Sequence, residues 1–313
     1  MEKKIYIIGS GFDEHHGVHT SYKTYKDYLE KIDSVMVRKI DEIFEDNGID
    51  FESIIKWAEL ENYLSFMHKY DEEEIEEIYQ YSFDNSENDL DKASYWSDPP
   101  HNASYKSKEF QKIYLFINEN FGAWINSLNT DNIYPDLILN KNACFLTFNY
   151  TEILENQYNI PKSNILHIHG SISEDKFVLG HNEHLDLPFS KEQRANMDPL
   201  TGEIYDSKDL REYQVEQAIN NASEEIYNTY FKNSKKLIDL YSDWFDKFNS
   251  ALEIEFKGLS CGKQDEIYIQ EIARRIPSNC NVLLYGHTDK DIEKMNIIKG
   301  KYFFNNNVEV KRW

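Results

Sequence analysis

The sequence predicts an α/β fold built on a parallel, Rossmann-like sheet, because short apolar runs alternate with helical segments. Runs at residues 3–9, 142–148 and 281–285 have the length of buried strands, and each ends at glycine or polar side chains. Helix-like YTEILENQY separates the second run from another at 164–169, which is the β-α-β alternation of a parallel sheet. Such sheets bind ligands at the carboxyl ends of their strands.

Two long helical segments are expected to interrupt this sheet. Apolar residues recur three and four apart through residues 34–128, and residues 209–257 read as one or two long helices. We therefore expect an α/β nucleotide-binding core at 1–33, 129–190 and 278–313, with helical insertions at 34–128 and 191–277. Three further runs read as short or edge strands: 176–181, 301–306 and 308–313.

The composition is that of a folded, acidic protein of enzyme size. The 313 residues are 40% hydrophobic and 14% aromatic, enough to bury a large core. The formal net charge of −22 disfavours nucleic acid as a partner, because binding a phosphate backbone needs clustered Lys and Arg. Residues 41–98 hold 19 Asp and Glu against 3 Lys and Arg, a local net charge of −16, so most of the net negative charge of the chain lies in this segment.

The cysteines and the apolar runs predict a cytoplasmic protein without a membrane span. Cys144, Cys261 and Cys280 are odd in number and far apart, which argues against a disulfide framework and a structural zinc site. The apolar stretch in MEKKIYIIGSG is too short for a signal peptide, and no apolar run approaches the ~18 residues of a membrane helix.

Clusters of glycine and polar residues follow four of the predicted strands. They are Gly9, Gly11 and Asp13; Asn149 and Thr151; His167, His169 and Gly170; and Gly286, His287, Asp289 and Asp291. Because the carboxyl ends of neighbouring parallel strands share one edge of a sheet, we expect the four clusters to meet in one ligand site.

The first cluster resembles the start of a dinucleotide-binding turn, which here comprises Gly9, Ser10, Gly11 and Phe12. Glycines in such a turn let backbone N–H groups approach a phosphate. Glu14 occupies the third glycine position of G-x-G-x-x-G, which disfavours a Rossmann dehydrogenase site, and a plain turn is the alternative. Asp13 could cap the next helix or hold a ribose hydroxyl.

The histidines allow both catalysis and metal binding. His167 and His169 are two residues apart and so share one face of a strand, which suits a metal site, as does the later pair of His181 and His184. A packed histidine without a ligand fits the same spacing. We favour catalysis by His169, because Gly170 after it permits close approach of a ligand. A structural role for His167 is equally expected.

Other polar residues of the first third of the chain have ordinary explanations. Glu61 follows Trp57 by four residues on a predicted helix, and we expect Trp57 to pack and Glu61 to be solvated. A catalytic role for Glu61 would require that helix to lean over the sheet ends. His15 and His16 lie in the first turn within reach of a ligand, whereas His19 reads as an exposed loop residue.

The motifs together resemble a known family. GSGFDEHHGVHTSY, W-x-x-L-E, LTFNYTEILE, HIHGS, VLGH and LLYGHTDKD, in this order, resemble the AbiH family of bacterial phage-abortive-infection proteins. The same skeleton is similar, more remotely, to sirtuin-like NAD-binding proteins, in which a Gly-x-Gly turn takes the phosphates. That resemblance implies NAD as substrate or ligand, with Asn149 and His169 as the catalytic pair and Asp13 in support.

The sirtuin-like resemblance also limits the activity. Sirtuin deacylases carry a four-cysteine zinc module, which three scattered cysteines cannot build. The resemblance therefore does not imply removal of acyl groups from lysine, and it leaves cleavage of NAD by water as the implied activity. The implied nucleotide-binding residues are Gly9, Ser10, Gly11, Phe12, Thr151, Gly170, Gly286, His287 and Asp289. No metal is expected. The helical insertions would control access or mediate homo-oligomerisation, and a phage or host protein would act as trigger.

Two other functions stay open. A metal-dependent hydrolase would use His167, His169, His181 and Asp289 and would hold zinc or manganese. A non-catalytic defence protein would only sense a nucleotide, while the acidic segment 41–98 binds a basic phage or host protein.

Overall fold

The computed structural model describes residues 3–46, 57, 60–84, 99–131, 133–174, 176–190 and 207–313. Within this part of the chain, six strands form one all-parallel sheet in the order β3-β2-β1-β4-β5-β6. The order 3-2-1-4-5-6 is that of the Rossmann fold. The predicted parallel, Rossmann-like α/β fold is therefore confirmed.

The strands are short and their carboxyl ends are level across the centre of the sheet. Their bounds are β1 Lys4–Ile8, β2 Cys144–Thr147, β3 Ile165–His167, β4 Glu253–Lys257, β5 Asn281–Gly286 and β6 Asn307–Arg312. Ile8 is in register with Thr147 on one side and Lys257 on the other, and Thr147 with His167. The segments after β1, β2, β3 and β4 therefore leave the sheet at one edge.

The chain divides into two units, of which the first holds the whole sheet and comprises residues 1–62, 118–182 and 232–313. Its helices are α1 Ser10–His15, α2 Tyr22–Ile32, α3 Ser34–Asp46, α8 Ile153–Asn156, α10 Ser234–Leu240, α11 Ser242–Phe245, α12 Glu266–Arg275 and α13 Asp289–Tyr302. The short helix α5, Leu60–Leu64, begins at its boundary. Short 3₁₀ turns are η2 Lys162–Asn164, η3 Ile172–Glu174, η4 Asp246–Ser250 and η5 Lys263–Asp265.

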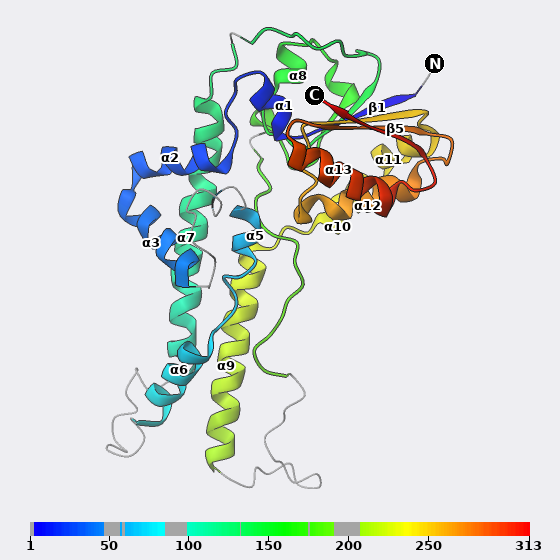
Figure 1. Ribbon diagram of the computed structural model, residues 1–313. Helices are drawn as coiled ribbons and strands as arrows, with labels where there is room; N and C mark the ends of the chain where they lie inside the picture. Colours follow the sequence, from blue (N-terminus) through cyan, green and yellow to red (C-terminus); the bar gives the residue numbers. More distant parts are fainter. Residues whose placement is uncertain are drawn as a thin grey trace. The chain divides into compact units, whose positions relative to one another are not determined.

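Both faces of β1 and β2 are buried, as parallel strands require. Ile5 and Ile7 of β1 face a core that includes Tyr268 of α12 and Met295 of α13. The intervening Tyr6 faces the opposite core, to which α8 contributes side chains. Figure 1 shows α8 on one side of the sheet and α12 and α13 on the other.

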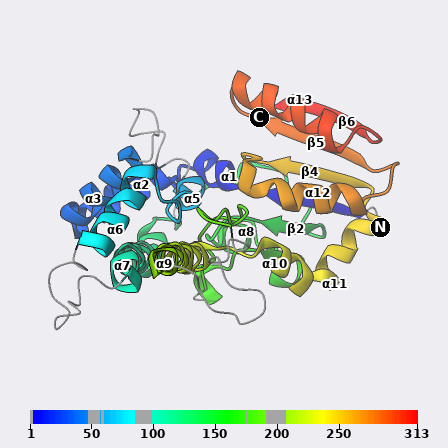
Figure 2. The same cartoon turned by 90° about the horizontal axis from the view of Figure 1, so that it is seen from below.

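In the second unit, residues 63–117 and 183–231, most of the described residues lie in helices. It contains α6 Glu72–Asp84, α9 Ser207–Tyr230 and the first part of α7, which spans Pro99–Ser127. Figures 1 and 2 show α7 and α9 side by side. A cluster around Ala103, Val215 and Ile219 packs these helices together, and Ser107 donates a 2.6 Å hydrogen bond to Glu225.

Three sequence-based expectations of secondary structure are wrong. Glu253–Lys257 is strand β4, not the end of a helix, because its charged positions are paired: Lys4 and Lys257 lie 2.6 Å and 2.8 Å from the Glu255 carboxylate. The run 176–181 has no strand, and residues 301–302 complete α13 while 303–306 form a turn. The edge strand expected at 308–313 is present as β6.

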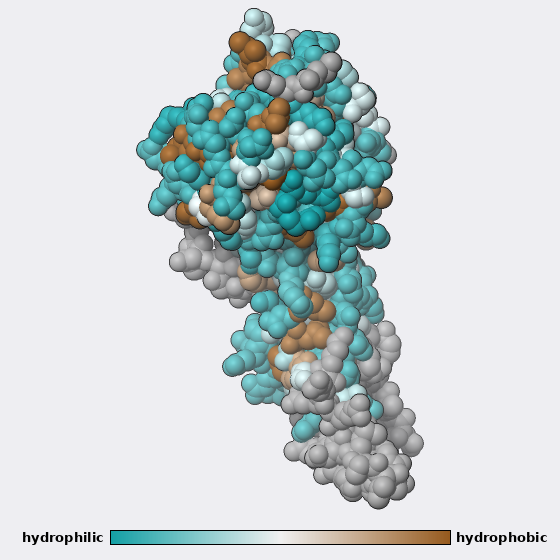
Figure 3. Space-filling model, turned by 90° about the vertical axis from the view of Figure 1, so that its right-hand side faces the viewer, coloured by the Kyte–Doolittle hydropathy of each residue, from teal (hydrophilic) through white to brown (hydrophobic). Residues whose placement is uncertain are grey.

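Much of the acidic segment 41–98, namely residues 47–56, 58–59 and 85–98, lies outside the described residues, as do residues 191–206 of the second expected insertion. On the face shown in Figure 3, hydrophilic side chains dominate and apolar ones form small groups. Among the helices of the described residues, none has the length and apolar composition that crossing a membrane requires.

Candidate functional site

A pocket of about 680 Å³ lies at the carboxyl ends of β1, β2, β3 and β4, and all residues that line it belong to the first unit. Four of the predicted site residues line it: Ser10, Asp13, Asn149 and His169. Ser10 and Asp13 follow β1, while Asn149 follows β2 and His169 follows β3, which is the position where parallel α/β folds bind ligands. Three of the four predicted clusters therefore contribute to one pocket.

Asp13, Asn149 and Thr151 form one buried hydrogen-bond network. The Asn149 side-chain amide donates to Asp13 Oδ1 at 2.7 Å and to the Gly9 carbonyl at 3.0 Å, and the Thr151 hydroxyl donates to Asp13 Oδ2 at 2.7 Å. The side-chain oxygen of Asn149 has no hydrogen-bond partner among the described residues, although Asn149 is only 7% exposed. A buried acceptor without a donor is costly, so a ligand hydroxyl or a water would stabilise this site.

Burial raises the pKa of Asp13 to about 7, while the hydrogen bonds from Thr151 and Asn149 oppose this rise. Asp13 is 1% exposed, and its carboxyl group keeps its proton more strongly than that of an ordinary aspartic acid. Asp13 can therefore exchange a proton near neutral pH, which is a property of groups in functional sites as well as of structural networks.

His169 is a buried, neutral histidine of the pocket. Its Nε2 lies 3.2 Å from the Tyr268 hydroxyl. Burial, together with the positive charge of Lys232, holds the pKa of His169 well below its usual range. At neutral pH the ring is unprotonated, so a nitrogen can accept a proton or a hydrogen bond.

Gly170, which follows His169, leaves room for the protein backbone and not for a ligand. Gly170 has a φ of +87°, and a Cβ atom there would lie 2.0 Å from the carbonyl oxygen of Lys176. The space that we expected a ligand to use is therefore filled by the backbone at residue 176, and Val178 donates to the His169 carbonyl nearby.

His167 is held by two protein acceptors. Its Nδ1 lies 2.8 Å from the Asn149 carbonyl oxygen and its Nε2 lies 2.8 Å from Glu155. Burial lowers the pKa of His167, but the hydrogen bond and charge of Glu155 outweigh it, and the net direction is upward. His167 therefore supports the backbone of Asn149, which agrees with the structural role considered for it.

The metal set of the alternative hydrolase does not assemble in the described part of the chain. There, the group of three His, Cys, Asp or Glu side chains whose ligand atoms lie close enough to share an ion is His15, His16 and Asp136. Both ring nitrogens of His167 contact protein acceptors, and Asp289 pairs with Arg312. In the described structure, His167, His169, His181 and Asp289 therefore do not bring their ligand atoms close enough together to share one ion.

The turn after β1 packs against the loop after β4. A Cβ atom at Gly9 would lie 2.5 Å from the Cα of Leu259, and one at Gly11 would lie 2.8 Å from the Cα of Gly258. Gly9 N–H donates to the Lys257 carbonyl at 3.1 Å, and Gly11 N–H to the Gly258 carbonyl at 2.8 Å. These two glycines therefore allow close approach of protein backbone, and their N–H groups already have acceptors.

The remaining predicted binding residues lie outside the pocket lining. Phe12 is 1% exposed and packs against His16 and Tyr158, and Thr151 reaches the site only through Asp13. The fourth cluster follows β5, which β4 separates from β1.

Gly286, His287 and Asp289 contact other parts of the chain. A Cβ atom at Gly286 would meet the Ile292 nitrogen at 2.8 Å, His287 Nδ1 lies 3.2 Å from the Trp313 carbonyl, and Arg312 pairs with Asp289. Next to them, Thr288 and Asp291 form the capping box of α13. This cluster begins a helix, as many polar strand ends do.

Glu61 lines the pocket, which the sequence interpretation did not expect, and it pairs with the buried side chain of Lys232. Trp57 is fully buried as expected, but Glu61 lines the pocket, and its oxygens lie 2.8 Å and 2.9 Å from Lys232 Nζ. Tyr22 also hydrogen-bonds Glu61. The W-x-x-L-E spacing was the available signal for Glu61, whereas no motif surrounds Lys232.

The pocket combines aromatic walls with carboxyl groups and two lysines. Its aromatic residues are Tyr22, Phe121, Trp124, Phe148 and Tyr150. Asp265, whose pKa burial raises to about 6, joins Asp13 and Glu61, and Lys263 and Lys294 also line the walls. Aromatic rings can stack on a base, carboxylates accept from sugar hydroxyls and lysines bind phosphate, so the lining suits a nucleotide.

The parallel sheet of order 3-2-1-4-5-6, with a polar pocket at its carboxyl edge, defines an α/β protein of the Rossmann-like class. The chain belongs to the AbiH family, described as bacteriophage abortive infection AbiH, whose profile matches residues 5–285. The match runs from β1 into β5, confirms the predicted membership, and assigns the chain to anti-phage abortive infection. No curated protein and no solved structure matches the chain.

Proposed function

We propose that this AbiH protein acts in abortive infection by binding NAD or a related nucleotide in the pocket and cleaving its N-glycosidic bond with water. The observation that carries the proposal is the placement of Asn149, with its unpartnered side-chain oxygen, in the same pocket as neutral His169. The sirtuin-like resemblance of the two motifs points to the same pair.

The reaction needs a fixed ribose, a positioned water and a stabilised cation. The bond between ribose C1′ and the nicotinamide nitrogen breaks, its electron pair stays on the nicotinamide, and the water oxygen bonds to C1′. The Asn149 side-chain oxygen would accept from the water or a ribose hydroxyl, and His169 would take the proton. The products are nicotinamide, ADP-ribose and one proton.

The carboxyl groups would favour the oxocarbenium-like transition state. Glu61 and Asp265 line the pocket, and Asp13 is joined to Asn149 by the 2.7 Å hydrogen bond. Negative charge near the developing cation stabilises it more than the ground state. Lys263 and Lys294 would contact the phosphates.

The test is nicotinamide release from NAD by purified protein, followed by chromatography, with and without lysate from phage-infected cells to supply a trigger. Wild type and His19→Ala, an exposed-histidine control, should release nicotinamide. Asn149→Ala and His169→Ala should lose at least ~10²-fold in rate, as expected for removal of a proton acceptor or positioning group. Absence of release under both conditions would refute the proposed cleavage.

A non-catalytic sensor makes a different prediction in the same experiment. NAD would raise the melting temperature of wild type without any nicotinamide release, and His169→Ala cells would keep their phage resistance. If NAD neither binds nor breaks down, the proposed nucleotide chemistry is wrong and the pocket serves another ligand.

A further inference from the structure

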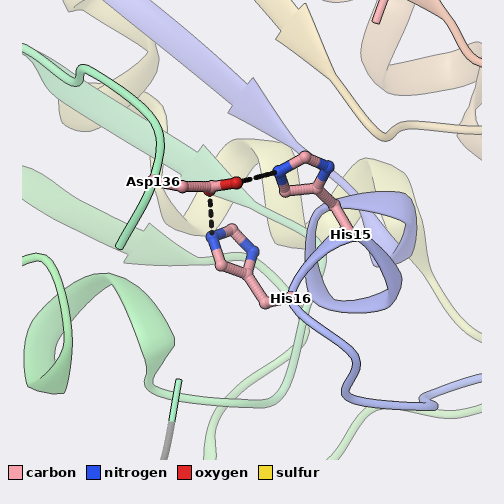
Figure 4. Close-up of side chains that lie close together, drawn as sticks. All are labelled: His15, His16 and Asp136. Carbon is pink, nitrogen blue, oxygen red and sulfur yellow. Dashed lines mark hydrogen bonds and ion pairs between the residues drawn. The ribbon is translucent and has the colours of Figure 1, made fainter. Parts of the chain in front are cut away.

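Away from the pocket lining, His15, His16 and Asp136 bring three metal-ligating side chains together in the first unit. One ligand atom from each lies within 4.8 Å of the others. His15 Nε2 is 3.1 Å from Asp136 Oδ2, and His16 Nε2 is 3.5 Å from Asp136 Oδ1. Figure 4 shows both imidazole rings directed toward the carboxylate.

The backbone explains how two consecutive histidines reach one carboxylate. Neighbouring residues of a continuous α-helix project roughly 100° apart, which separates their side chains. Here α1 ends at His15, His16 is its C-cap, and Gly17 turns the chain with a φ of +73°. The two rings then lie edge to face, with centroids 5.0 Å apart.

His16 has the orientation of a metal-ligating histidine. Its Nδ1 lies 2.6 Å from the carbonyl oxygen of Phe12. Because a carbonyl only accepts, Nδ1 carries the hydrogen, and Nε2 of the neutral ring presents its lone pair. A carbonyl partner of this kind fixes the tautomer and ring position in known metal sites.

The lone pair of His16 and the Asp136 carboxylate are two acceptors that face each other. The Tyr158 hydroxyl accepts from the Leu137 N–H and donates to His16 Nε2 at 2.6 Å, and Asp136 Oδ1 lies 3.5 Å from the same nitrogen. An ion bound at Nε2 would replace the Tyr158 hydrogen bond. A cation between the imidazoles and the carboxylate would satisfy all three ligands at once. Trp313 stacks on His15 with ring centroids 4.9 Å apart, which holds the second imidazole.

We propose that His15, His16 and Asp136 bind one divalent transition-metal ion such as zinc. Two imidazole nitrogens and one carboxylate leave one position of a tetrahedral ion for water. An ion and a water could reach this site from solvent, because the side chains of His15 and Asp136 are 29% and 51% exposed, whereas that of His16 is 1% exposed. The ion would link the end of α1, which carries Asp13, to the loop before β2. This inference departs from the expectation of no metal and is independent of the proposed function.

The test is a titration of chelator-treated and dialysed protein with zinc by calorimetry, and with cobalt by visible absorption. Wild type and His19→Ala should bind one zinc ion per chain with equal affinity. Asp136→Asn and His15→Ala should lose at least ~10-fold in affinity, a loss that even an outer partner of a metal can cause. Zinc should raise the melting temperature of wild type by mass action.

Measurements without metal distinguish the loss of a metal ligand from a loss of folding. Asp136 and His15 are partly exposed, so both variants should match wild type in circular dichroism and in melting temperature without metal. His15→Gln provides a second, conservative change at the same position. Equal zinc affinity of wild type and Asp136→Asn, or an equal loss in His19→Ala, would overturn the proposed site.

Discussion

Asp13 and Asn149, which are 136 residues apart in the chain, are joined by a 2.7 Å hydrogen bond from the Asn149 amide to the Asp13 carboxylate. The bond connects the turn after β1 to the end of β2 and directs the free oxygen of Asn149 away from Asp13. Protonation of Asp13 therefore changes the charge of a group that lines the pocket.

Asp13→Asn should change how stability depends on pH. The pKa of Asp13 is about 7 in the folded protein against 3.8 for an ordinary aspartic acid, so between these values the folded state holds a proton that the unfolded state has lost. The stability that this proton contributes is complete below 3.8 and is lost as the pH rises through 7. Urea unfolding at several pH values measures it.

The difference between wild type and Asp13→Asn isolates this residue from other titrating groups. The free energy of unfolding of wild type, relative to the variant, should increase as the pH falls from 8 to 5, by an amount on the order of a few kcal/mol. A difference that does not depend on pH would show that Asp13 ionises normally.

Glu61 and Lys232 should be strongly coupled. The side chain of Lys232 is 1% exposed, so Glu61→Gln leaves a buried cation unpaired and should cost ~3–5 kcal/mol of unfolding free energy. The double variant Glu61→Gln/Lys232→Met should cost less than the sum of the two single changes. Urea unfolding of all four proteins completes the cycle, and strict additivity would mean that the ion pair contributes nothing.

Two glycines with left-handed backbones should differ in their tolerance of alanine. A Cβ atom at Gly17, where φ is +73°, would meet nothing within 4 Å, so Gly17→Ala should cost only the backbone strain of ~1–2 kcal/mol. Gly170→Ala must also displace the Lys176 carbonyl and should cost more. Equal unfolding free energies of the two variants would contradict the close approach at Gly170.

The fourth polar cluster should matter for stability and not for the pocket. Thr288→Ala removes the side chain that accepts from the Asp291 N–H at the start of α13, at a cost of ~1 kcal/mol. Nicotinamide release should stay at the wild-type rate. A large loss of release in a variant that melts close to wild type would place the β5 end in the site after all.

The sequence allowed prediction of those parts of the site that follow uninterrupted apolar runs. Asn149 and His169 each come directly after such a run, and the strand order then places them in one pocket. Strand β4 was assigned to the end of a helix, although its alternation of charged and apolar residues is itself typical of a strand. The ion pairs that allow its charged residues to be buried are visible only in the fold. Lys232 could not be identified for the same reason, since its partner Glu61 is 171 residues away.

The fourth polar cluster, after β5, shows that residue types can predict a binding site where the fold places none of them in the pocket. Gly286 and Asp291 have the residue types of a binding site, but a polar strand end that begins a helix has the same composition. Only the order of the strands, with β4 between β1 and β5, separates the two interpretations.

The packing of Gly9 and Gly11 against Gly258 and Leu259 has a mechanical consequence. No side chain lies between the two backbones, and two backbone hydrogen bonds join them, so the β1 turn and the loop after β4 are in direct contact. That loop leads to Lys263 and Asp265, and the turn leads to Asp13. A displacement of the loop after β4 is therefore transmitted through this contact to the turn that precedes Asp13.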